Sequence, residues 1–380
     1  IRLPPCAHAP SKTPSVQIAR TGCQTGLVYV EQRLLKELSW KTFRQENHFQ
    51  VTEDESEHVV TLRMHAWNPK LSTRIGAIIW SWLTLRLVGI YIRRHGKPDL
   101  IHAHFGTWAG YAARLAYKCY GIPYVVTEHA SSINGGKVTP GQATTLRTAY
   151  KDARKIICVG TQLKQNLTPY LDRPDKAIVI PNFVDISTFR PNGKQTEKEK
   201  SFTFVSVGNL SRRKGFAELI DAFARHFSDK PHVSLVIAGD GEEEDNLRQQ
   251  IHGLHLEGQI SLAGRLPRKE VADLLARSDA FVLASYAETF GIVFIEAMAA
   301  GLPAIGTVGG GPEDIITPES GYLIRSGDVQ ALGQKMQELY EHYEQFDKAA
   351  IRRSVAERFD FAQAGQKLLK VYQEAIQEHE

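Results

Sequence analysis

The chain has 380 residues, of which 42% are hydrophobic and 23% are charged. These proportions exclude a disordered or fibrous protein, and the length exceeds what one hydrophobic core usually fills, so we expect two globular domains. The four cysteines form no CxxC pair and are too few for a disulfide framework, which indicates a reducing cytoplasm.

Charge is distributed unevenly along the chain. Residues 1–189 contain 24 Lys and Arg against 13 Asp and Glu, a net charge of +11, whereas residues 190–380 contain 22 against 29, a net charge of −7. A basic first half suits an anionic acceptor, a phosphate-bearing lipid or an acidic membrane surface, and it equally suits a solvated face without a partner.

The first 70 residues carry weak structural signals. Before residue 40 only "SVQIA", residues 15–19, predicts a strand, and "ENHFQVTEDESEHVVTLRM", residues 46–64, predicts one or two exposed strands joined by an acidic turn. The first thirty residues lack an apolar core after a basic start, so we expect no signal peptide.

Residues 75–92, "IGAIIWSWLTLRLVGIYI", form the one stretch long enough to suggest a membrane. Arg86 near its middle would cost roughly 2.5–3.5 kcal/mol in a spanning helix, which argues against spanning. Two interpretations stay open: a core helix, or a helix that touches a membrane surface and is flanked by Arg74, Arg93 and Arg94.

From residue 98 onward short β-branched runs alternate with amphipathic stretches, a pattern typical of βαβ units and mostly parallel sheets. We expect strands in "PDLIHAHF", "PYVVTEHA", "KIICVGT", "AIVIPNF", "FTFVSVGN", "VSLVIAGDG", "QISLAGR", "DAFVLAS" and "PAIGTVGG". The alternation breaks at the polar stretch "FRPNGKQTEKEKS", residues 189–201, which predicts a linker.

The expected architecture is therefore two Rossmann-like, doubly wound α/β domains facing each other across a cleft, where parallel sheets bind ligands beyond their carboxyl ends. The N-terminal domain spans residues 1–190, the linker 191–200 and the C-terminal domain 201–357. A last helix, residues 358–380, packs on either domain, and packing back on the N-terminal domain is the arrangement that we expect.

A basic turn, "LSRRKG", follows the strand "FTFVSVGN" and places Arg212, Arg213 and Lys214 before a helix. Free backbone N–H groups and the positive end of the helix dipole suit a diphosphate there, and Arg and Lys add donors and charge. The alternative is a solvated basic turn.

Two further glycine-rich turns follow strands. In "AGDGEEEDNL" the acids Glu242, Glu243 and Glu244 occupy the first helical turn, where they would repel phosphate and favour a structural role. In "GGGPEDII", residues 309–316, Pro312 and Glu313 open a helix, and the loop either approaches a ligand closely or is a plain turn.

Two acids lie seven residues apart in "ETFGIVFIE". If a helix begins near Phe290 or Gly291, Glu288 lies just before it and Glu296 about one and a half turns inside it. Carboxylates accept hydrogen bonds from vicinal hydroxyls of a ribose or hexose. The alternative is one dipole-stabilising acid and one exposed acid, but the apolar surroundings imply partial burial and hence partners.

Two neighbouring strands end in histidines. In "IHAHF" we expect His102 and His104 on opposite faces of the strand end, and His129 ends the next strand in "VVTEHA". These ends suggest a shared cleft lip, although each histidine is equally explained as a structural side chain. The spacing is poor for a metal site.

In this order, "GNLSRRKG", "AGDGEEEDNL", "SDAFVLASYAETFGIVFIEAMAAGLPAIGT" and "GGGPE" resemble the retaining, nucleotide-sugar-dependent glycosyltransferases of family 4, which have the GT-B fold. "VIPNFVDISTFRP" is similar to that family's segment before the linker, and "GLVYVEQRLLKEL", residues 26–38, to its N-terminal acceptor-side helix. The resemblance covers residues 98–360 well and residues 22–38 faintly.

The resemblance implies a role for each matching residue. Lys214, with Arg213 or Arg212, holds the diphosphate; Glu288 binds the donor sugar with the N–H groups of Phe290 and Gly291; Glu296 binds the ribose. Catalytic roles fall on His104, Glu288, Lys214 and Arg213, and His129, Gly22 and Gly26 border the acceptor. The implied donor-binding residues are Asn209, Arg212, Arg213, Lys214, Leu266, Glu288, Thr289, Phe290, Gly291, Ile292 and Glu296. Asn209 stands where the family usually has arginine.

The implied function is metal-independent, retaining transfer of a hexose from a UDP-, GDP- or ADP-sugar to a glycan or lipid-linked acceptor, as in polysaccharide, lipopolysaccharide or glycolipid synthesis. A nucleotide-sugar is the donor substrate and no cofactor is expected. We expect a cytoplasmic protein, peripheral on the inner membrane face, without nucleic-acid partners. An inactive glycosyltransferase-like binding subunit and a GT-B nucleotide-sugar epimerase are the alternatives.

Overall fold

The computed structural model describes residues 22–33, 48–56, 58–67, 74–191 and 201–379, together with Ala19, Trp40 and Arg44. The chain forms two compact units. Unit 1 comprises Ile1–Cys158, Asn166–Ile180 and Gly365–Glu380, and unit 2 comprises Val159–Gln165 and Pro181–Ala364. Residues 159–165 and 181–190, expected in the N-terminal domain, thus cluster with unit 2, and the expected linker lies outside the described residues apart from Pro191.

Unit 1 contains a four-stranded parallel sheet with the order β4-β5-β6-β7. Its strands are β4 (Ile101–His104), β5 (Tyr124–Glu128), β6 (Ile156–Cys158) and β7 (Ala177–Val179). Between and after them lie the π-helical turn η2 (Phe105–Gly110), α4 (Tyr111–Tyr120), α5 (Ser131–Asn134), α6 (Pro140–Lys151), the 3-10 turns η3 (Thr168–Tyr170) and η4 (Pro174–Lys176), and α15 (Phe361–Gln377). α7 (Thr161–Leu167) and α15 are each divided between the two units. The four strands are those that the sequence predicts.

A second sheet in unit 1 has the order β1-β3-β2, with β1 (Thr25–Arg33) parallel to β3 (Val59–Trp67) and β2 (Val51–Ser56) antiparallel to it. The helix α3 (Arg74–His95) packs against it, and side chains from the sheet and the helix, Val30, Leu62, Met64, Ala66 and Leu87, form one buried cluster.

The structure corrects two expectations in this region. Residues 26–38, expected as a helix, begin with the strand β1, because the run Leu27–Val30 is rich in β-branched and aromatic residues and pairs with β3 along its whole length. The acids expected in a turn lie within β2, and β3 is largely buried rather than exposed. The proposed first strand at residues 15–19 lies outside the described residues except for Ala19.

The helix α3 is long and apolar enough to cross a membrane by length and composition. Within its apolar window of 18 residues, 56% is buried inside the protein. Two sides of the helix therefore serve as core: Leu87 packs with the sheet, and Leu85 and Val88 pack with Ala116 of α4. Another face is open to solvent, with Ile75 53% and Trp82 58% exposed.

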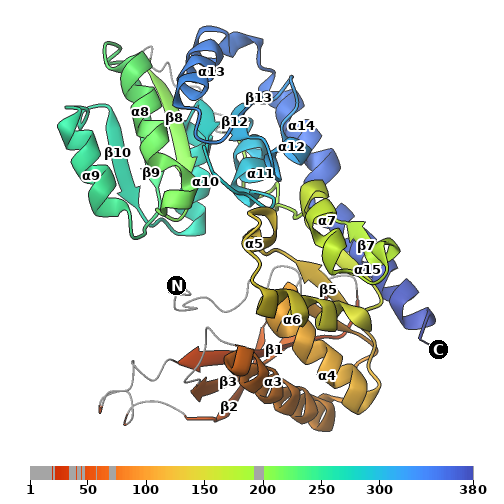
Figure 1. Ribbon diagram of the computed structural model, residues 1–380. Coiled ribbons are helices and arrows are strands. Elements are labelled where there is room, and N and C mark those ends of the chain that lie inside the picture. Colours follow the sequence, from red (N-terminus) through yellow and green to blue (C-terminus); the bar gives the residue numbers. More distant parts are fainter. Residues whose placement is uncertain are drawn as a thin grey trace. The chain divides into compact units, whose positions relative to one another are not determined.

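Unit 2 is built on a six-stranded parallel sheet with the order β10-β9-β8-β11-β12-β13 (Figure 1). Its strands are β8 (Phe202–Val207), β9 (Val233–Ala238), β10 (Ile260–Gly264), β11 (Ala280–Val282), β12 (Ala304–Thr307) and β13 (Gly321–Ile324). Its other elements are the 3-10 turns η5 (Arg212–Lys214) and η6 (Tyr343–Gln345), α8 (Phe216–Phe227), α9 (Glu244–Gly253), α10 (Arg268–Arg277), α11 (Ile292–Ala299), α12 (Pro312–Ile315), α13 (Val329–Glu341) and α14 (Lys348–Phe359).

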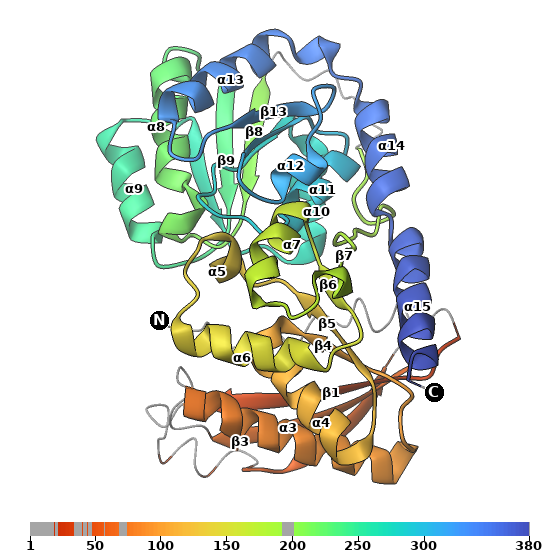
Figure 2. The same ribbon diagram turned by 45° about the vertical axis from the view of Figure 1, so that its right-hand side comes forward.

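The strand order of unit 2 is that of a doubly wound fold, in which the chain reverses direction across the sheet between β8 and β11. The helices α8, α9 and α13 cover one face of the sheet and α10, α11 and α12 the other (Figures 1 and 2). Five of the six strands are predicted from the sequence, and β13 is not, since four residues with a glycine give too short a pattern. Ligands of such folds bind beyond the carboxyl ends of the two strands at the reversal point.

Candidate functional site

The segments that follow β8 and β11 bring the basic turn and the acidic segment together. After β8 the chain forms η5, and Gly215, with φ of 69°, then starts α8. A side chain at Gly215 would overlap the carbonyl oxygen of Ala284, which follows β11. The N–H of Tyr286 donates to the carbonyl oxygen of Arg213 at 2.8 Å. Backbone contacts thus fix the basic turn beside the loop that leads to Glu288.

Lys214 and Glu288 form an ion pair at the reversal point. The Nζ of Lys214 donates to Oε2 of Glu288 at 2.5 Å, and the two side chains are 14% and 13% exposed. Arg212 and Arg213 remain exposed to solvent on the same turn. A half-buried cation, two exposed cations and a carboxylate therefore meet where an anionic ligand with hydroxyl groups finds both kinds of partner.

The helix α11 begins where the sequence predicts, with Gly291 as its N-cap at φ of 87°. Glu296 lies inside the helix, 13% exposed, and the Nη2 of Arg268 is 3.6 Å from its Oε1. Burial raises the pKa of Glu296 to about 7, and the Arg268 guanidinium opposes that rise. Near neutral pH both the ionised and the protonated form of this carboxyl group are therefore populated.

The loop "GGG", residues 309–311, packs against the backbone of the segment from Glu288 to Phe290. Side chains at Gly310 and Gly311 would overlap the backbone of Glu288 and Phe290, and the N–H of Gly311 donates to the carbonyl oxygen of Glu288 at 3.1 Å. Glu313 accepts from the N–H groups of Gly309 and Gly310, at 2.8 and 3.1 Å. The close approach that these glycines permit is thus to the chain itself.

The remaining predicted donor-binding residues lie around this centre in unit 2. Asn209, exposed after β8, donates from Nδ2 to the carbonyl oxygen of Asp240 at 3.0 Å. Leu266 follows β10 and is half-buried. Between Glu288 and α11, Thr289 is half-buried and Phe290 buried, and Ile292 is 42% exposed. In the acidic turn "AGDGEEEDNL" between β9 and α9, Glu244 is the first residue of α9, Glu243 is its N-cap and Glu242 precedes the helix.

The histidines of unit 1 form a row rather than pointing to opposite faces. The rings of His102 and His104 stack with centroids 4.5 Å apart, because side chains two residues apart on a strand point to the same face, so the expectation of opposite faces is wrong. The His104 and His129 rings stack at 5.3 Å, and Nδ1 of His104 and Nε2 of His129 share a hydrogen bond of 3.1 Å. Burial lowers the pKa of His104 to about 4 and that of His129 to about 3.

Comparison with known families identifies the chain. The model of glycosyl transferases group 1 matches residues 189–353, and the model of glycosyltransferase family 4 matches residues 42–188. N-acetyl-alpha-D-glucosaminyl L-malate synthase of Bacillus anthracis is 31% identical over 275 residues, which cover 69% of this chain and 71% of that protein. The chain belongs to the family 4 glycosyltransferases.

Glycogen synthase of Mycobacterium tuberculosis is 30% identical to this glycosyltransferase over 257 residues, 65% of this chain and 61% of the synthase. Among solved structures, sucrose-phosphate synthase from Thermosynechococcus elongatus superposes with a TM-score of 0.81 at 19% identity, over 97% of this chain and 92% of the other. Anabaena HepE in complex with UDP-glucose gives a TM-score of 0.67 at 22% identity, over 91% and 98%. These likenesses show the GT-B fold.

The predicted acceptor-side glycines of the glycosyltransferase lie at the start of β1. Gly22 precedes the strand with φ of 89°, and a side chain at Gly26 would overlap the ring of Tyr91 on α3. Gly26 is therefore explained by the packing of β1 against α3. An acceptor role for either glycine stays a prediction.

One buried carboxylate that sequence reasoning left without a role holds the histidine loops. Glu128, at the end of β5, accepts from the N–H of Gly106 at 2.9 Å and the hydroxyl of Tyr150 at 2.6 Å through Oε2. Its Oε1 accepts from the N–H groups of His129 and Ala130, each at 2.9 Å. An acid inside the apolar run "YVVTE" was the available signal, because a buried carboxylate requires such partners.

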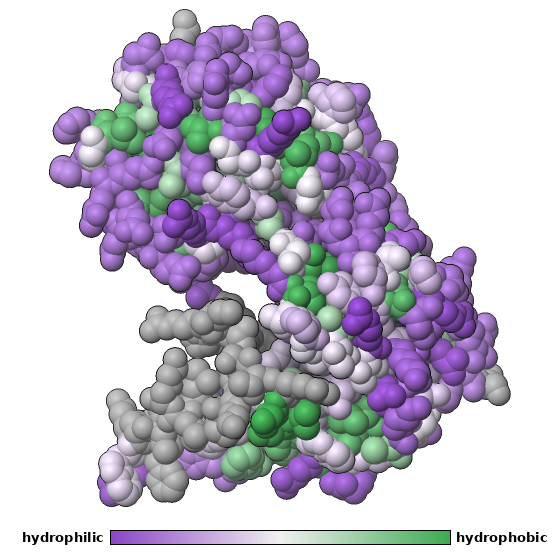
Figure 3. All heavy atoms as spheres, in the orientation of Figure 1, coloured by the Kyte–Doolittle hydropathy of each residue, from purple (hydrophilic) through white to green (hydrophobic). Residues whose placement is uncertain are grey.

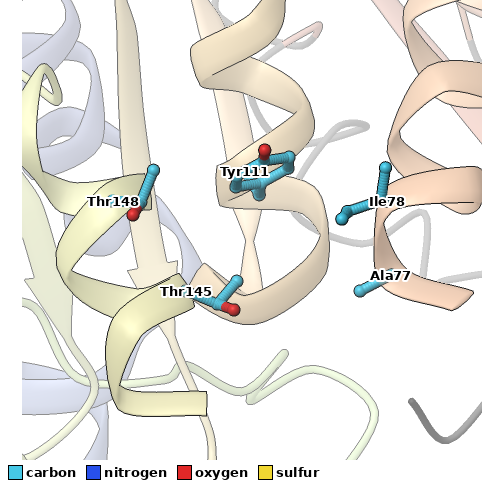
Figure 4. Close-up of a pocket in the computed structure, with 5 residues that line it drawn as sticks. All are labelled: Ala77, Ile78, Tyr111, Thr145 and Thr148. Carbon is cyan, nitrogen blue, oxygen red and sulfur yellow. The ribbon is translucent and has the colours of Figure 1, made fainter. Parts of the chain in front are cut away.

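A shallow pocket in unit 1 lies between α3, α4 and α6 (Figure 4). Ala77, Ile78, Tyr111, Thr145 and Thr148 line it. The two threonine hydroxyls donate to carbonyl oxygens of their own helix, at 3.0 and 2.8 Å. This lining includes no cation for a diphosphate, unlike the reversal point in unit 2.

Proposed function

We propose that this glycosyltransferase transfers a hexose from a nucleotide-diphosphate sugar to a glycan or lipid-linked acceptor and retains the α configuration. The observation that carries the proposal is the Lys214–Glu288 pair at the reversal point of the unit 2 sheet, followed in the chain by the helix that holds Glu296. A nucleotide-sugar needs cations for its diphosphate and hydrogen-bond acceptors for the hydroxyls of its two sugars, and this group of side chains supplies both.

Each side chain then has a role in the donor complex. Lys214, with Arg212 or Arg213, binds the diphosphate, and Glu288 accepts from hydroxyls of the transferred sugar. Glu296 accepts hydrogen bonds from the ribose hydroxyls, and backbone groups around Leu266 bind the nucleotide base.

The chemical step breaks the bond between the anomeric carbon and the diphosphate oxygen, which leaves with the electron pair. The acceptor oxygen forms the new bond on the same face and gives up its proton to the departing diphosphate oxygen. Lys214 and Arg213 stabilise the charge that grows on the diphosphate, as preorganised cations do without a reorganisation cost. For His104 the proposal keeps the role at the reacting sugar that the family resemblance implies.

Uridine diphosphate sugars are the first donors to test, since HepE was solved with UDP-glucose and the pneumococcal O-GlcNAc transferase GtfA with UDP and GlcNAc. The protein is incubated with UDP-, GDP- and ADP-sugars, released nucleotide is measured, and thermal shifts rank binding, since a ligand at 100 times its Kd adds about 2.7 kcal/mol. Slow release of one nucleotide supports the proposal. Binding without release favours an inactive subunit, and interconversion of the donor without an acceptor favours an epimerase.

Donor binding is expected to strengthen with pH through Glu296. The ionised carboxylate accepts both ribose hydroxyls, and with a pKa of about 7 its ionised fraction rises about tenfold between pH 6 and pH 8. The Kd of the best nucleotide-sugar should therefore fall about tenfold over that range, measured by calorimetry. Glu296→Gln should bind more weakly with a flat profile, and an equally steep profile in that variant contradicts the assignment.

We also propose that unit 1 touches an anionic membrane surface through α3. Ile75, Trp82, Arg86 and Arg93 are all exposed, and at 3.6 residues per turn they point within roughly 20° of one direction. Figure 3 shows hydrophobic side chains gathered over α3 on the face in view. An aromatic ring with arginines on one stripe is the pattern of an interfacial helix.

Substitutions on that stripe should weaken vesicle binding. Arg86→Ala should lower the affinity for vesicles with anionic phosphatidylglycerol about fivefold, since one basic residue near such a surface contributes about 1 kcal/mol. Trp82→Glu should lower it further and should also weaken any binding to neutral phosphatidylcholine vesicles, whereas Arg86→Ala should leave that binding unchanged. Leu254→Glu, at a 38% exposed position in unit 2, is the control. Equal losses in all three variants would count against the α3 surface.

A further inference from the structure

We propose that His102, Thr127 and Tyr372 are positioning residues for His104, and that they hold its imidazole neutral and in one orientation toward the transferred sugar. The proposal deepens the proposed function and rests on it for the role of His104. It is carried by the histidine row, defined here as His102, His104 and His129, and by the two hydroxyls at one end of the row.

His102 is held at both ring nitrogens. Its Nδ1 shares a hydrogen bond of 2.5 Å with the hydroxyl of Tyr372, and its Nε2 shares one of 2.6 Å with Oγ1 of Thr127. A neutral imidazole has one N–H and one lone pair, and a hydroxyl matches either. The ring is therefore pinned in place whichever tautomer it adopts, and it cannot rotate without losing a hydrogen bond.

His104 contacts both other rings of the row. The pinned His102 ring stacks on it at 4.5 Å with an interplanar angle of 25°, and the His129 ring stacks at 5.3 Å with an angle of 12°. In the part of the chain that the structure describes, Nδ1 of His104 is engaged by Nε2 of His129, so Nε2 of His104 is the nitrogen that remains for a ligand. The row thus determines which edge of the imidazole the sugar meets.

The row also sets the charge of His104. Burial lowers the pKa of His102, His104 and His129, and a proton on one ring opposes a proton on its neighbours. The Tyr372 and Thr127 hydroxyls stabilise a neutral ring without adding a counter-ion. Neutrality suits the reaction, because the anomeric carbon becomes positive as the diphosphate leaves, and an imidazolium beside it would raise the barrier.

The C-terminal helix is part of this arrangement. Tyr372 lies on α15, 270 residues after His102 in the chain. The end of the same helix region is held in unit 1 by Lys155–Glu378, at 3.6 Å, and by Arg154 and His379, whose side chains are 2.9 Å apart. A helix that completes unit 1 therefore brings a hydroxyl to the histidine row.

The test compares substitutions that remove a hydroxyl with one that keeps it. Thr127→Val and Tyr372→Phe should each lower kcat about tenfold or more, because misorientation of a reacting group by a fraction of an ångström has effects of this order. The Kd of the nucleotide-sugar should stay within twofold. Thr127→Ser keeps the hydroxyl and should retain kcat within threefold, and thermal unfolding should show all variants folded.

A readout independent of turnover separates this proposal from the proposed function. In full-length protein labelled with ¹⁵N-histidine, the His104 ring signals, assigned through His104→Gln, should show one neutral tautomer at pH 7. In Thr127→Val they should shift or broaden. If the wild-type protein turns over no donor, the proposed function fails while these spectra still decide the positioning. Unchanged spectra, or a kcat within twofold of wild type in Thr127→Val and Tyr372→Phe, overturn the proposal.

Discussion

Replacement of Lys214 by alanine is expected to lower kcat for glycosyl transfer by about 10² to 10³, the effect of removing one preorganised group that stabilises transition-state charge. Lys214 is the half-buried cation at the reversal point of the unit 2 sheet, where water screens its charge less than that of the exposed Arg212 and Arg213. The diphosphate gains charge as the glycosidic bond breaks, so the loss should appear mainly in kcat. Steady-state kinetics at saturating donor and acceptor measure it.

The substitution also leaves Glu288 without the cation 2.5 Å away, so the free energy of unfolding must be followed in parallel. Arg248→Ala is the matched control, since this exposed cation on α9 pairs with Glu244 on its own helix. It should leave kcat within twofold. A Lys214→Ala protein that is folded and loses less than tenfold in kcat would remove Lys214 from the leaving-group site.

The absence of the family's usual arginine at position 209 has a local explanation. Asn209 stands where the family usually has arginine, and its amide donates to the carbonyl oxygen of Asp240, thereby linking the loops after β8 and β9. The short Asn side chain brings no cation to the donor. In the proposed donor complex the second positive charge is therefore assigned to Arg212 or Arg213, on the turn fixed by the hydrogen bond between Tyr286 and Arg213.

The sequence predicts unit 2 well because short patterns of neighbouring residues mark its strands and helix starts. Runs of β-branched residues mark β8 to β12, and the glycines at positions 215 and 291 stand where helices begin with a left-handed residue. The placement of Glu288 before α11 and of Glu296 within it follows from the same pattern. The burial that raises the pKa of Glu296 depends on neighbours from other elements, and a sequence pattern cannot give its size.

Prediction from the sequence fails where contacts between distant segments determine the structure. The strand β1 pairs with β3, more than thirty residues away, whereas the family resemblance of its sequence predicts a helix. Tyr372 reaches His102 across 270 residues, and no local signal marks that contact. The shared face of His102 and His104, by contrast, follows from the two-residue period of a strand and is contained in the sequence.

Gly311→Ala is expected to lower kcat at least 10²-fold and to destabilise the protein by about 1–3 kcal/mol, the usual cost of overpacking. The added methyl group would overlap the Cα of Phe290, which belongs to the backbone and has no rotamer to change. The segment from Glu288 to Gly291 must move, and with it the carboxylate of Glu288 and the N–H groups proposed to bind the donor sugar. Kinetics, together with denaturant unfolding, measure both effects.

Gly253→Ala is the matched control, because Gly253 ends α9 and, among the described residues, no heavy atom lies within 4 Å of an added Cβ. Alanine there should be neutral or stabilise by up to about 1 kcal/mol, with kcat unchanged. If Gly311→Ala instead loses stability but keeps kcat within threefold, the "GGG" loop supports the fold alone, and the geometry of the donor site does not depend on it. Loss of both in Gly311→Ala, with neither in Gly253→Ala, links the packing of Gly311 to the position of Glu288.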